Sequence, residues 1–141
     1  MERYSSRFGE FQVDKENIIV FSQGIPGFSE LHRFVILPHA EDSPVHFLQC
    51  LDNTEISFAI TNPKLFFTDY QVIVEQSELM ELRLSSIKEA LVFVILVVAS
   101  NPKNITANLL APIIINPQNK IGRQVVMTGD KYTTSHRLLA R

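Results

Sequence analysis

Short apolar or alternating segments, each closed by turn-forming residues, are the feature of this 141-residue sequence that most restricts its fold. Turn signals such as Asn62-Pro63, Asn101-Pro102 and Gly129-Asp130 separate the segments and leave little room for long helices. The pattern predicts an all-β, mainly antiparallel fold in one domain over residues 1–141, built as a small barrel or a sandwich. The expected strands are Arg7–Val13, Asn17–Phe21, Phe34–Leu37, His46–Leu51, Ser57–Thr61, Tyr70–Glu75, Leu91–Val98, Asn108–Ile115 and Arg123–Thr128.

The longest apolar run, Ala90–Ala99, has 10 residues. A membrane-spanning helix needs about 20, so we expect a buried element and no membrane span. Within this run, Leu91–Val98 is apolar at nearly every position, which is typical of a central strand covered on both faces. Pro112 lies inside another expected strand and indicates an edge position or a bulge there.

One or two short helices are expected beside the strands. The better candidate is Glu78–Arg83, with Ser77 as its N-cap and Glu78 in its first turn. A second helical turn is expected from Ser86, because Glu89 follows three residues later, as in a capping box.

The segment Gly24-Ile25-Pro26-Gly27 predicts a tight structural turn. Pro26 fixes its own φ near about −65°, and Gly27 can take the positive φ that a type II turn requires. A functional alternative stays open, in which this segment is a docking loop that exposes Phe28.

Acidic residues are concentrated in the first part of the chain. Residues 1–89 hold 14 acidic and 7 basic residues, a balance of −7, whereas residues 90–141 hold 1 acidic and 6 basic residues, a balance of +5. Either the two parts neutralise each other on one surface, or an acidic face is available to a basic partner. The sharpest acidic stretch contains Asp69, Glu75, Glu78 and Glu81, which form either a solvated face or a docking surface.

No pattern typical of a catalytic site or a cofactor site occurs, so we expect no enzyme and no cofactor. His46 and Cys50 share a face of one expected strand, but two ligands do not make a zinc site, and we expect a surface histidine and a buried thiol. A single cysteine and an N-terminus without an apolar run favour a cytoplasmic protein. The net charge of −2 gives no support to binding of nucleic acid through phosphate neutralisation.

Four further residues are candidate protein contacts. Phe66 and Phe67 are adjacent, so in an extended segment they point to opposite sides and one of them is a candidate for exposure. Asn104 and Asn108 lie near the expected Pro112 strand, where their amides either satisfy loop backbone groups or form a polar contact in an interface.

Several segments together, in order along nearly the whole chain, resemble the bacterial flagellar assembly factor family FliW. They are Phe21–Phe28 (FSQGIPGF), Arg33–Val35 (RFV), Phe47–Asp52 (FLQCLD), Asn62–Tyr70 (NPKLFFTDY), Thr106–Asn116 (TANLLAPIIIN), Gly122–Val126 (GRQVV) and the pair Tyr132 and His136. The resemblance implies a compact barrel-like fold without a catalytic site. It also implies a cytoplasmic protein that binds the RNA-binding regulator CsrA, relieves its repression of flagellin translation, and binds newly made flagellin in exchange.

The acidic stretch is our expected docking surface for CsrA, because a regulator that holds RNA must carry basic surface. Flagellin is then expected on a more apolar surface, with Phe66 or Phe67 as anchor, and the protein is expected to be a monomer on its own. The alternative from a different class is a small barrel that binds RNA directly, which would need a continuous basic groove.

Overall fold

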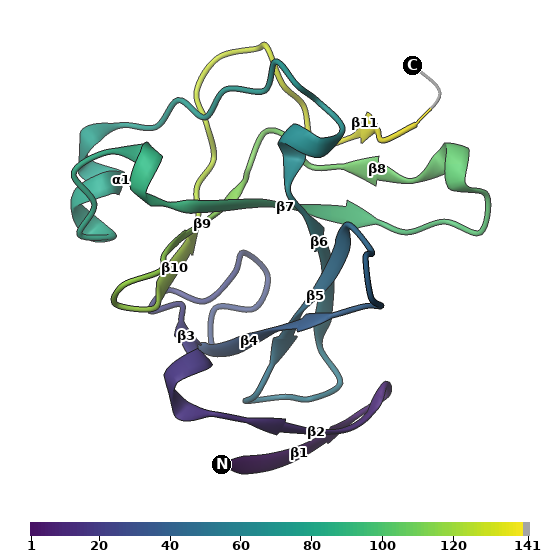
Figure 1. The fold of residues 1–141 in the computed structure, drawn as a ribbon. Coiled ribbons are helices and arrows are strands. Elements are labelled where there is room, and N and C mark those ends of the chain that lie inside the picture. The colour runs from purple at the N-terminus through teal and green to yellow at the C-terminus, as the bar shows by residue number, and fades with distance from the viewer. Residues whose placement is uncertain (140–141) are drawn as a thin grey trace.

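A computed structural model describes residues 1–139, and most of its regular structure is strand (Figure 1). The strands are β1 (Glu2–Ser6), β2 (Gly9–Val13), β3 (Ile19–Val20), β4 (Arg33–Pro38), β5 (Val45–Cys50), β6 (Ser57–Thr61), β7 (Leu91–Val97), β8 (Thr106–Ala107), β9 (Ile113–Asn116), β10 (Ile121–Gln124) and β11 (His136–Arg137). One short α-helix, α1 (Gln76–Glu81), and 3₁₀ turns η1 (Lys15–Asn17), η2 (Pro63–Leu65), η3 (Ile87–Glu89) and η4 (Pro102–Asn104) complete the described elements.

Seven strands close into a barrel. Their order is β7-β6-β5-β4-β3-β10-β9, and pairing of β9 back onto β7 completes the circle. All neighbours are antiparallel except β3 and β10, which pair in parallel through Val20 and Ile121. The all-β, mainly antiparallel prediction is therefore confirmed, and the structure decides for a barrel over a sandwich.

Aromatic and branched side chains fill the barrel. Phe21, Phe34, Leu48 and Ile60 are among the residues fully buried there, and the rings of Phe21 and Phe34 meet edge to face at 5.1 Å. Gly122 on β10 lies directly against the Phe21 ring, where a Cβ atom would approach the ring Cζ to 2.6 Å. The ring therefore occupies the space that any larger residue at 122 would need.

Strand β7 is the central strand predicted from its apolar run. Its odd-numbered residues Phe93 and Ile95 pack against the barrel core, and its even-numbered Val94 and Leu96 are buried in a second cluster outside the barrel. Both faces are thus covered in the middle of the strand, as expected. The prediction of a buried strand over Leu91–Val98 is wrong at the ends, because Leu91, Val97 and Val98 are exposed.

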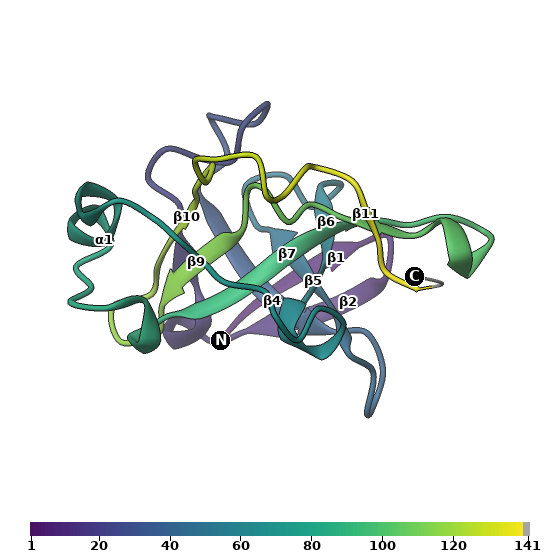
Figure 2. The same ribbon diagram turned by 90° about the horizontal axis from the view of Figure 1, so that it is seen from above.

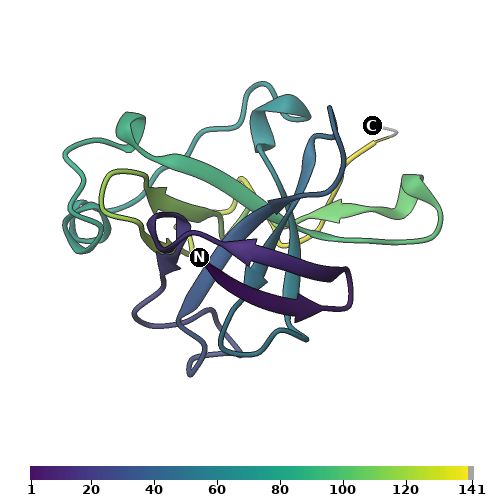
Figure 3. The ribbon, with the colours of Figure 1, turned by 60° about the horizontal axis from the view of Figure 1, so that its bottom comes forward.

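We call this second cluster the outer cluster. It consists of Ala59, Tyr70, Val94, Leu96, Ala107, Leu109, Met127 and Leu138. The segment between η2 and α1 crosses over β7 and covers part of this face (Figure 2). On another side, the β1–β2 hairpin lies across the barrel, with Val13 buried against Val35 and Leu51 (Figure 3).

The expected strand Tyr70–Glu75 is wrong, although its alternation is real. Tyr70 is buried and Val72 and Val74 are half-buried, while Gln71 and Ile73 are exposed. No strand pairs with this segment in the described part of the chain, because its amides find side chains instead: Gln71 donates to the Tyr132 hydroxyl and Ile73 to the Met127 sulfur. Burial of one face produces period-two alternation whether or not a ladder forms.

The expected strand Asn108–Ile115 is also wrong as one element, because the chain bends between β8 and β9. Pro112 stands in this break, just before β9, and its carbonyl accepts a hydrogen bond from Val125. The expected strand Arg7–Val13 is shorter in the structure, where β2 begins at Gly9. The expected strand Arg123–Thr128 is placed too late, because β10 runs over Ile121–Gln124.

Helix α1 begins earlier than expected. Its N-cap is Glu75, so Ser77 lies inside the helix and is not a cap. The capping box is confirmed, since the Ser86 hydroxyl accepts from the Lys88 amide and the Glu89 carboxylate accepts from the Ser86 amide. No helix within residues 1–139 is long and apolar enough to span a membrane.

Replacement of Gly122 by alanine tests the packing of the barrel. We expect Gly122→Ala to lower the free energy of unfolding by about 1–3 kcal/mol, because the buried Phe21 ring cannot move without disturbing its neighbours. Urea unfolding of Gly122→Ala, Phe21→Leu and the double variant gives the measurement. The double variant should lose less than the sum of the single losses, and additive losses would contradict the proposed contact.

Candidate protein-binding surfaces

The acidic stretch lies on α1 and the segment leading into it. Asp69, Glu75 and Glu81 are exposed, but Glu78 Oε1 lies 2.7 Å from Nε of Arg123 on β10. The side chains of Glu78 and Arg123 are only 27% and 24% exposed, and Glu78 Oε1 accepts no well-aligned hydrogen bond, so the contact is an ion pair. One of the four predicted docking charges therefore holds the helix to the barrel.

This ion pair joins the acidic and the basic parts of the chain. Leu79 and Leu82 pack beside it against Ile114 and Val125, which fixes α1 on the outside of the barrel. The first interpretation of the charge pattern is that the acidic and the basic parts of the chain neutralise each other. At Glu78 this interpretation holds. The other three carboxylates, Asp69 in the segment before α1, Glu75 at its N-cap and Glu81 at its end, are exposed, and we call them the acidic surface.

The adjacent phenylalanines are less accessible than expected. Phe66 and Phe67 are both half-buried against the outer cluster, and the Phe67 ring meets the His136 ring at 6.2 Å. The expectation that one of them is exposed is wrong, because the chain turns at η2 and does not stay extended. The preceding Leu65 is the exposed apolar residue of this turn, at 61%.

The two asparagines differ in their surroundings. The Asn108 side-chain oxygen accepts a hydrogen bond from the Ala111 amide at 3.0 Å, so this side chain organises the bend between β8 and β9. Asn104 ends η4 and is exposed. Asn104 is the more exposed of the two, since Asn108 is half-buried.

The turn at Gly24–Gly27 is a structural one. Phe28 donates its amide to the Ile25 carbonyl at 2.6 Å, and Gly27 has a φ of 88°, which confirms the type II geometry. Phe28 is half-buried and packs edge to face on Phe58, so it is not the exposed phenylalanine that the docking alternative requires. Gly24 has a φ of 65°, and a Cβ there would lie 2.5 Å from the Phe28 carbonyl oxygen.

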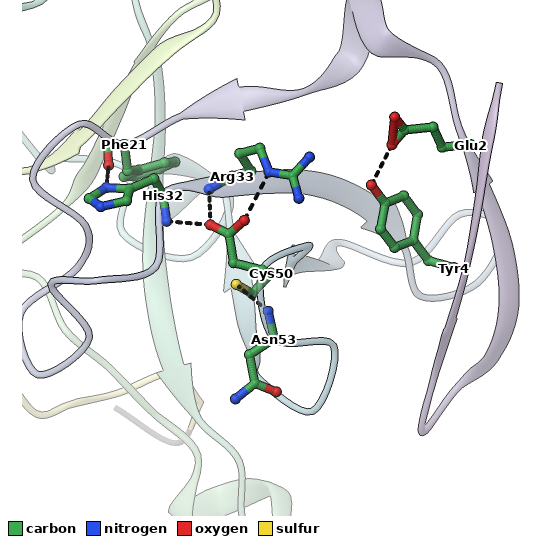
Figure 4. A network of polar contacts seen from close by, with 8 residues as sticks. Glu2, Tyr4, Phe21, His32, Arg33, Cys50 and Asn53 are labelled. Carbon is green, nitrogen blue, oxygen red and sulfur yellow. Dashed lines mark hydrogen bonds and ion pairs between the residues drawn. The ribbon is translucent and has the colours of Figure 1, made fainter.

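A polar network not foreseen from the sequence holds the start of β4. The Asp52 carboxylate accepts hydrogen bonds from the amides of His32 and Arg33 and from Nε of Arg33 (Figure 4). Burial raises the pKa of Asp52, but the hydrogen bonds from His32 and Arg33 outweigh it and hold the pKa below its usual value. The His32 ring in turn contacts the Phe21 carbonyl oxygen through Nδ1 at 2.9 Å.

A second polar contact not foreseen from the sequence lies within the outer cluster. The buried Tyr70 hydroxyl donates to the Leu109 carbonyl at 2.8 Å, and burial raises the pKa of this phenol above its usual range. Tyr70 therefore stays protonated and acts as a fixed donor.

The histidine and the cysteine on β5 have different surroundings. Cys50 is buried, burial raises the pKa of its thiol, and its sulfur accepts from the Asn53 amide. His46 packs edge to face on Phe93. Among residues 1–139, no three side chains of histidine, cysteine, aspartate or glutamate gather closely enough to hold a metal ion.

A groove of about 750 Å³ lies where the segment before α1 crosses β7. Its lining residues are Asn62, Pro63, Lys64, Tyr70, Gln71, Val72, Ile73, Ile87, Lys88, Ala90, Leu91, Val92 and Phe93. Sequence reasoning missed this feature, because its walls come from three segments that only the fold brings together.

Known proteins share both the sequence and the fold. The family model described as FliW protein matches residues 2–138. A flagellar assembly factor FliW of Caldanaerobacter subterraneus is 39% identical over 140 residues, which cover 99% of this chain and 93% of that protein. One of Bacillus subtilis is 41% identical over 128 residues, covering 91% and 90%. A crystal structure of the flagellar assembly factor FliW superposes with a TM-score of 0.92 at 32% identity, covering 99% of both chains.

Two glycine variants separate backbone strain from steric conflict. Gly27→Ala meets nothing within 4 Å and should lower the free energy of unfolding by about 1 kcal/mol through its positive φ alone. Gly24→Ala adds a collision with the backbone of Phe28 and Ser29 and should cost on the order of 3 kcal/mol. Thermal and urea unfolding of both variants provide the test. Equal losses of unfolding free energy in Gly24→Ala and Gly27→Ala would show that the backbone near Gly24 relieves the collision without cost.

The Asp52 network predicts a defined pH dependence. Its folded pKa lies below the unfolded value, so its contribution to stability is complete at neutral pH and is lost as the pH falls through the folded pKa. We expect Asp52→Asn to lower the free energy of unfolding by about 1 kcal/mol at pH 7, an amount reduced by the partial exposure of the pair. The difference in the free energy of unfolding between the parent and Asp52→Asn should become smaller below about pH 4. A gap that is constant from about pH 7 to about pH 3 would contradict a charged role for Asp52.

Proposed function

Because the chain belongs to the FliW family, we propose that it is a cytoplasmic flagellar assembly factor that binds the translational regulator CsrA and flagellin. In this proposal it acts by binding and not by catalysis. Capture of CsrA relieves the repression of flagellin translation, and newly made flagellin displaces CsrA in exchange. Family membership over nearly the full chain is the observation that carries the proposal. The alternative of a barrel that binds RNA directly has no support from the comparisons.

The acidic surface, on α1 and the segment before it, is our candidate site for CsrA. Asp69, Glu75 and Glu81 are exposed there, and a protein that holds RNA phosphates offers basic side chains to such a surface. Electrostatic attraction between them raises the association rate and weakens with salt. Glu78 contributes less to this attraction, because Arg123 already neutralises it.

Flagellin is proposed on a different, apolar surface at the end of β7 and along β8 and β11. Val97 and Val98 are 63% and 66% exposed there, and β11 pairs with β8 beside them. Phe67 packs against His136 of β11. Asn104 ends η4, which connects β7 to β8. Exposed apolar residues with a polar contact at the rim are typical of protein interfaces.

Charge reversal on the acidic surface tests the CsrA site. We expect Glu75→Lys with Glu81→Lys to weaken CsrA binding at least tenfold, or about 1.4 kcal/mol, and to leave flagellin binding unchanged. The matched control is Glu10→Lys with Glu30→Lys, which reverses two exposed carboxylates outside the acidic surface. Calorimetric titrations at low and high salt give the affinities. If the test and the control double variants weaken CsrA binding equally, the effect comes from net charge alone. If the test double variant leaves CsrA binding unchanged, the assignment is refuted.

A further inference from the structure

The ladder between β6 and β7 ends before β7 does. The last pair is Thr61 with Val94, whereas β7 begins three residues earlier, at Leu91. Over Leu91–Phe93, β7 pairs with β9 on one edge, and no described strand pairs with its other edge. The chain after Thr61 turns away into η2, where Pro63 has no N–H to donate and could not extend the ladder. Figure 2 shows β7 continuing past this point towards η3 without a strand on that side.

The free edge presents main-chain groups of Val92. Ile95 accepts the Asn108 amide at 2.9 Å, so the polar main-chain groups of Ile95 face the β8 and β9 edge. Main-chain direction alternates along a strand, so Leu91 and Phe93 face β9 and the N–H and C=O of Val92 face the opposite, open edge. An extended segment placed there could complete the ladder.

The walls of the groove define what kind of segment fits. Ile73 and Leu91 are 61% and 45% exposed, and they offer apolar surface on two sides. Lys64 and Lys88 are exposed, belong to η2 and η3, and form no ion pair with any residue in 1–139. None of the lining residues is acidic. The groove thus combines an open β-edge, apolar walls and uncompensated positive charge.

We propose that this groove binds an extended peptide segment of a protein partner, with apolar and acidic residues in alternation, by adding it to β7 as a strand. Main-chain hydrogen bonds to Val92 provide affinity, Leu91 and Ile73 receive the apolar side chains, and Lys64 and Lys88 pair with the carboxylates. None of the lining residues belongs to the two surfaces of the proposed function, although Asp69 of the acidic surface directly precedes Tyr70. The proposal does not depend on those surfaces. A second copy of this chain is the disfavoured occupant, because edge-to-edge pairing would bring lysines of both copies together.

The probe for the test is a fluorescent octapeptide of alternating valine and glutamate. We expect saturable binding in fluorescence anisotropy, and we expect Lys64→Glu with Lys88→Glu to weaken it at least tenfold. Lys15→Glu with Lys103→Glu is the matched control, since it reverses two exposed lysines outside the groove and should change the affinity less than twofold. A peptide with lysine in place of glutamate should bind at least tenfold more weakly to the unaltered protein.

Two measurements isolate the main-chain contact. We compare a peptide N-methylated at its valines with one N-methylated at its glutamates. Only one of the two should lose binding, because only one set of N–H groups faces β7 in an added strand. This comparison leaves the protein unchanged. In two-dimensional NMR the Val92 amide should show one of the largest shifts on titration with the peptide. Absence of binding, binding insensitive to the groove lysines, or shifts confined to another surface would each overturn the proposal. Concentration-dependent dimers that Lys64→Glu with Lys88→Glu strengthens would overturn it in favour of a second copy.

Discussion

Pairing of β7 with β9 is the contact on which the rest of the structure depends. It brings Leu91 opposite Ile115 and turns an open sheet into a closed barrel around Phe21 and Phe34. Closure removes most of the strand edges that an open sheet of this size would expose. It also leaves β7 with an apolar outer face, which the segment before α1 and the residues around Met127 must cover. The barrel and the outer cluster are therefore two cores that share one strand.

The charge distribution follows from the same arrangement. Strand β10, from the basic part of the chain, lies next to α1, from the acidic part, and Arg123 meets Glu78 where they pack together. Pairing at this point stabilises the docking of a helix of only six residues, which could not persist alone. Asp69, Glu75 and Glu81 form no ion pair with another described residue. They are therefore the carboxylates of this stretch that we propose for partner binding.

Strong local patterns predict structure correctly in this chain. The strand Ser57–Thr61, the capping box at Ser86 and the type II turn at Pro26 each depend on residues close together in the sequence, and the structure has all three. The extended segment at Tyr70 is wrongly predicted as a strand, because alternation indicates burial and not the partner that accepts each amide. Strand β1 is not predicted at all, since its residues are mostly polar and the sequence pattern does not show its pairing with β2.

Site residues are harder to predict than strands, because their accessibility depends on tertiary contacts. No local pattern indicates that Arg123 neutralises Glu78 or that η2 turns Phe66 and Phe67 onto the outer cluster. The open edge of β7 is a clearer case, since it arises from where one strand ends relative to another. The open edge can be recognised only from the register between β6 and β7, which the sequence pattern does not define here.

The parallel pair of β3 and β10 has a consequence for synthesis of the protein. It joins Val20 to Ile121, so a chain emerging from the ribosome cannot close its barrel until about a hundred further residues have followed β3. Until then the Phe21 ring has no Gly122 to pack against, and the inner faces of β4 to β7 stay open to solvent. Such an intermediate exposes unpaired edges and apolar side chains together, the combination that makes partly folded chains prone to aggregate. The order of strands along the chain thus sets when the barrel can form as well as how.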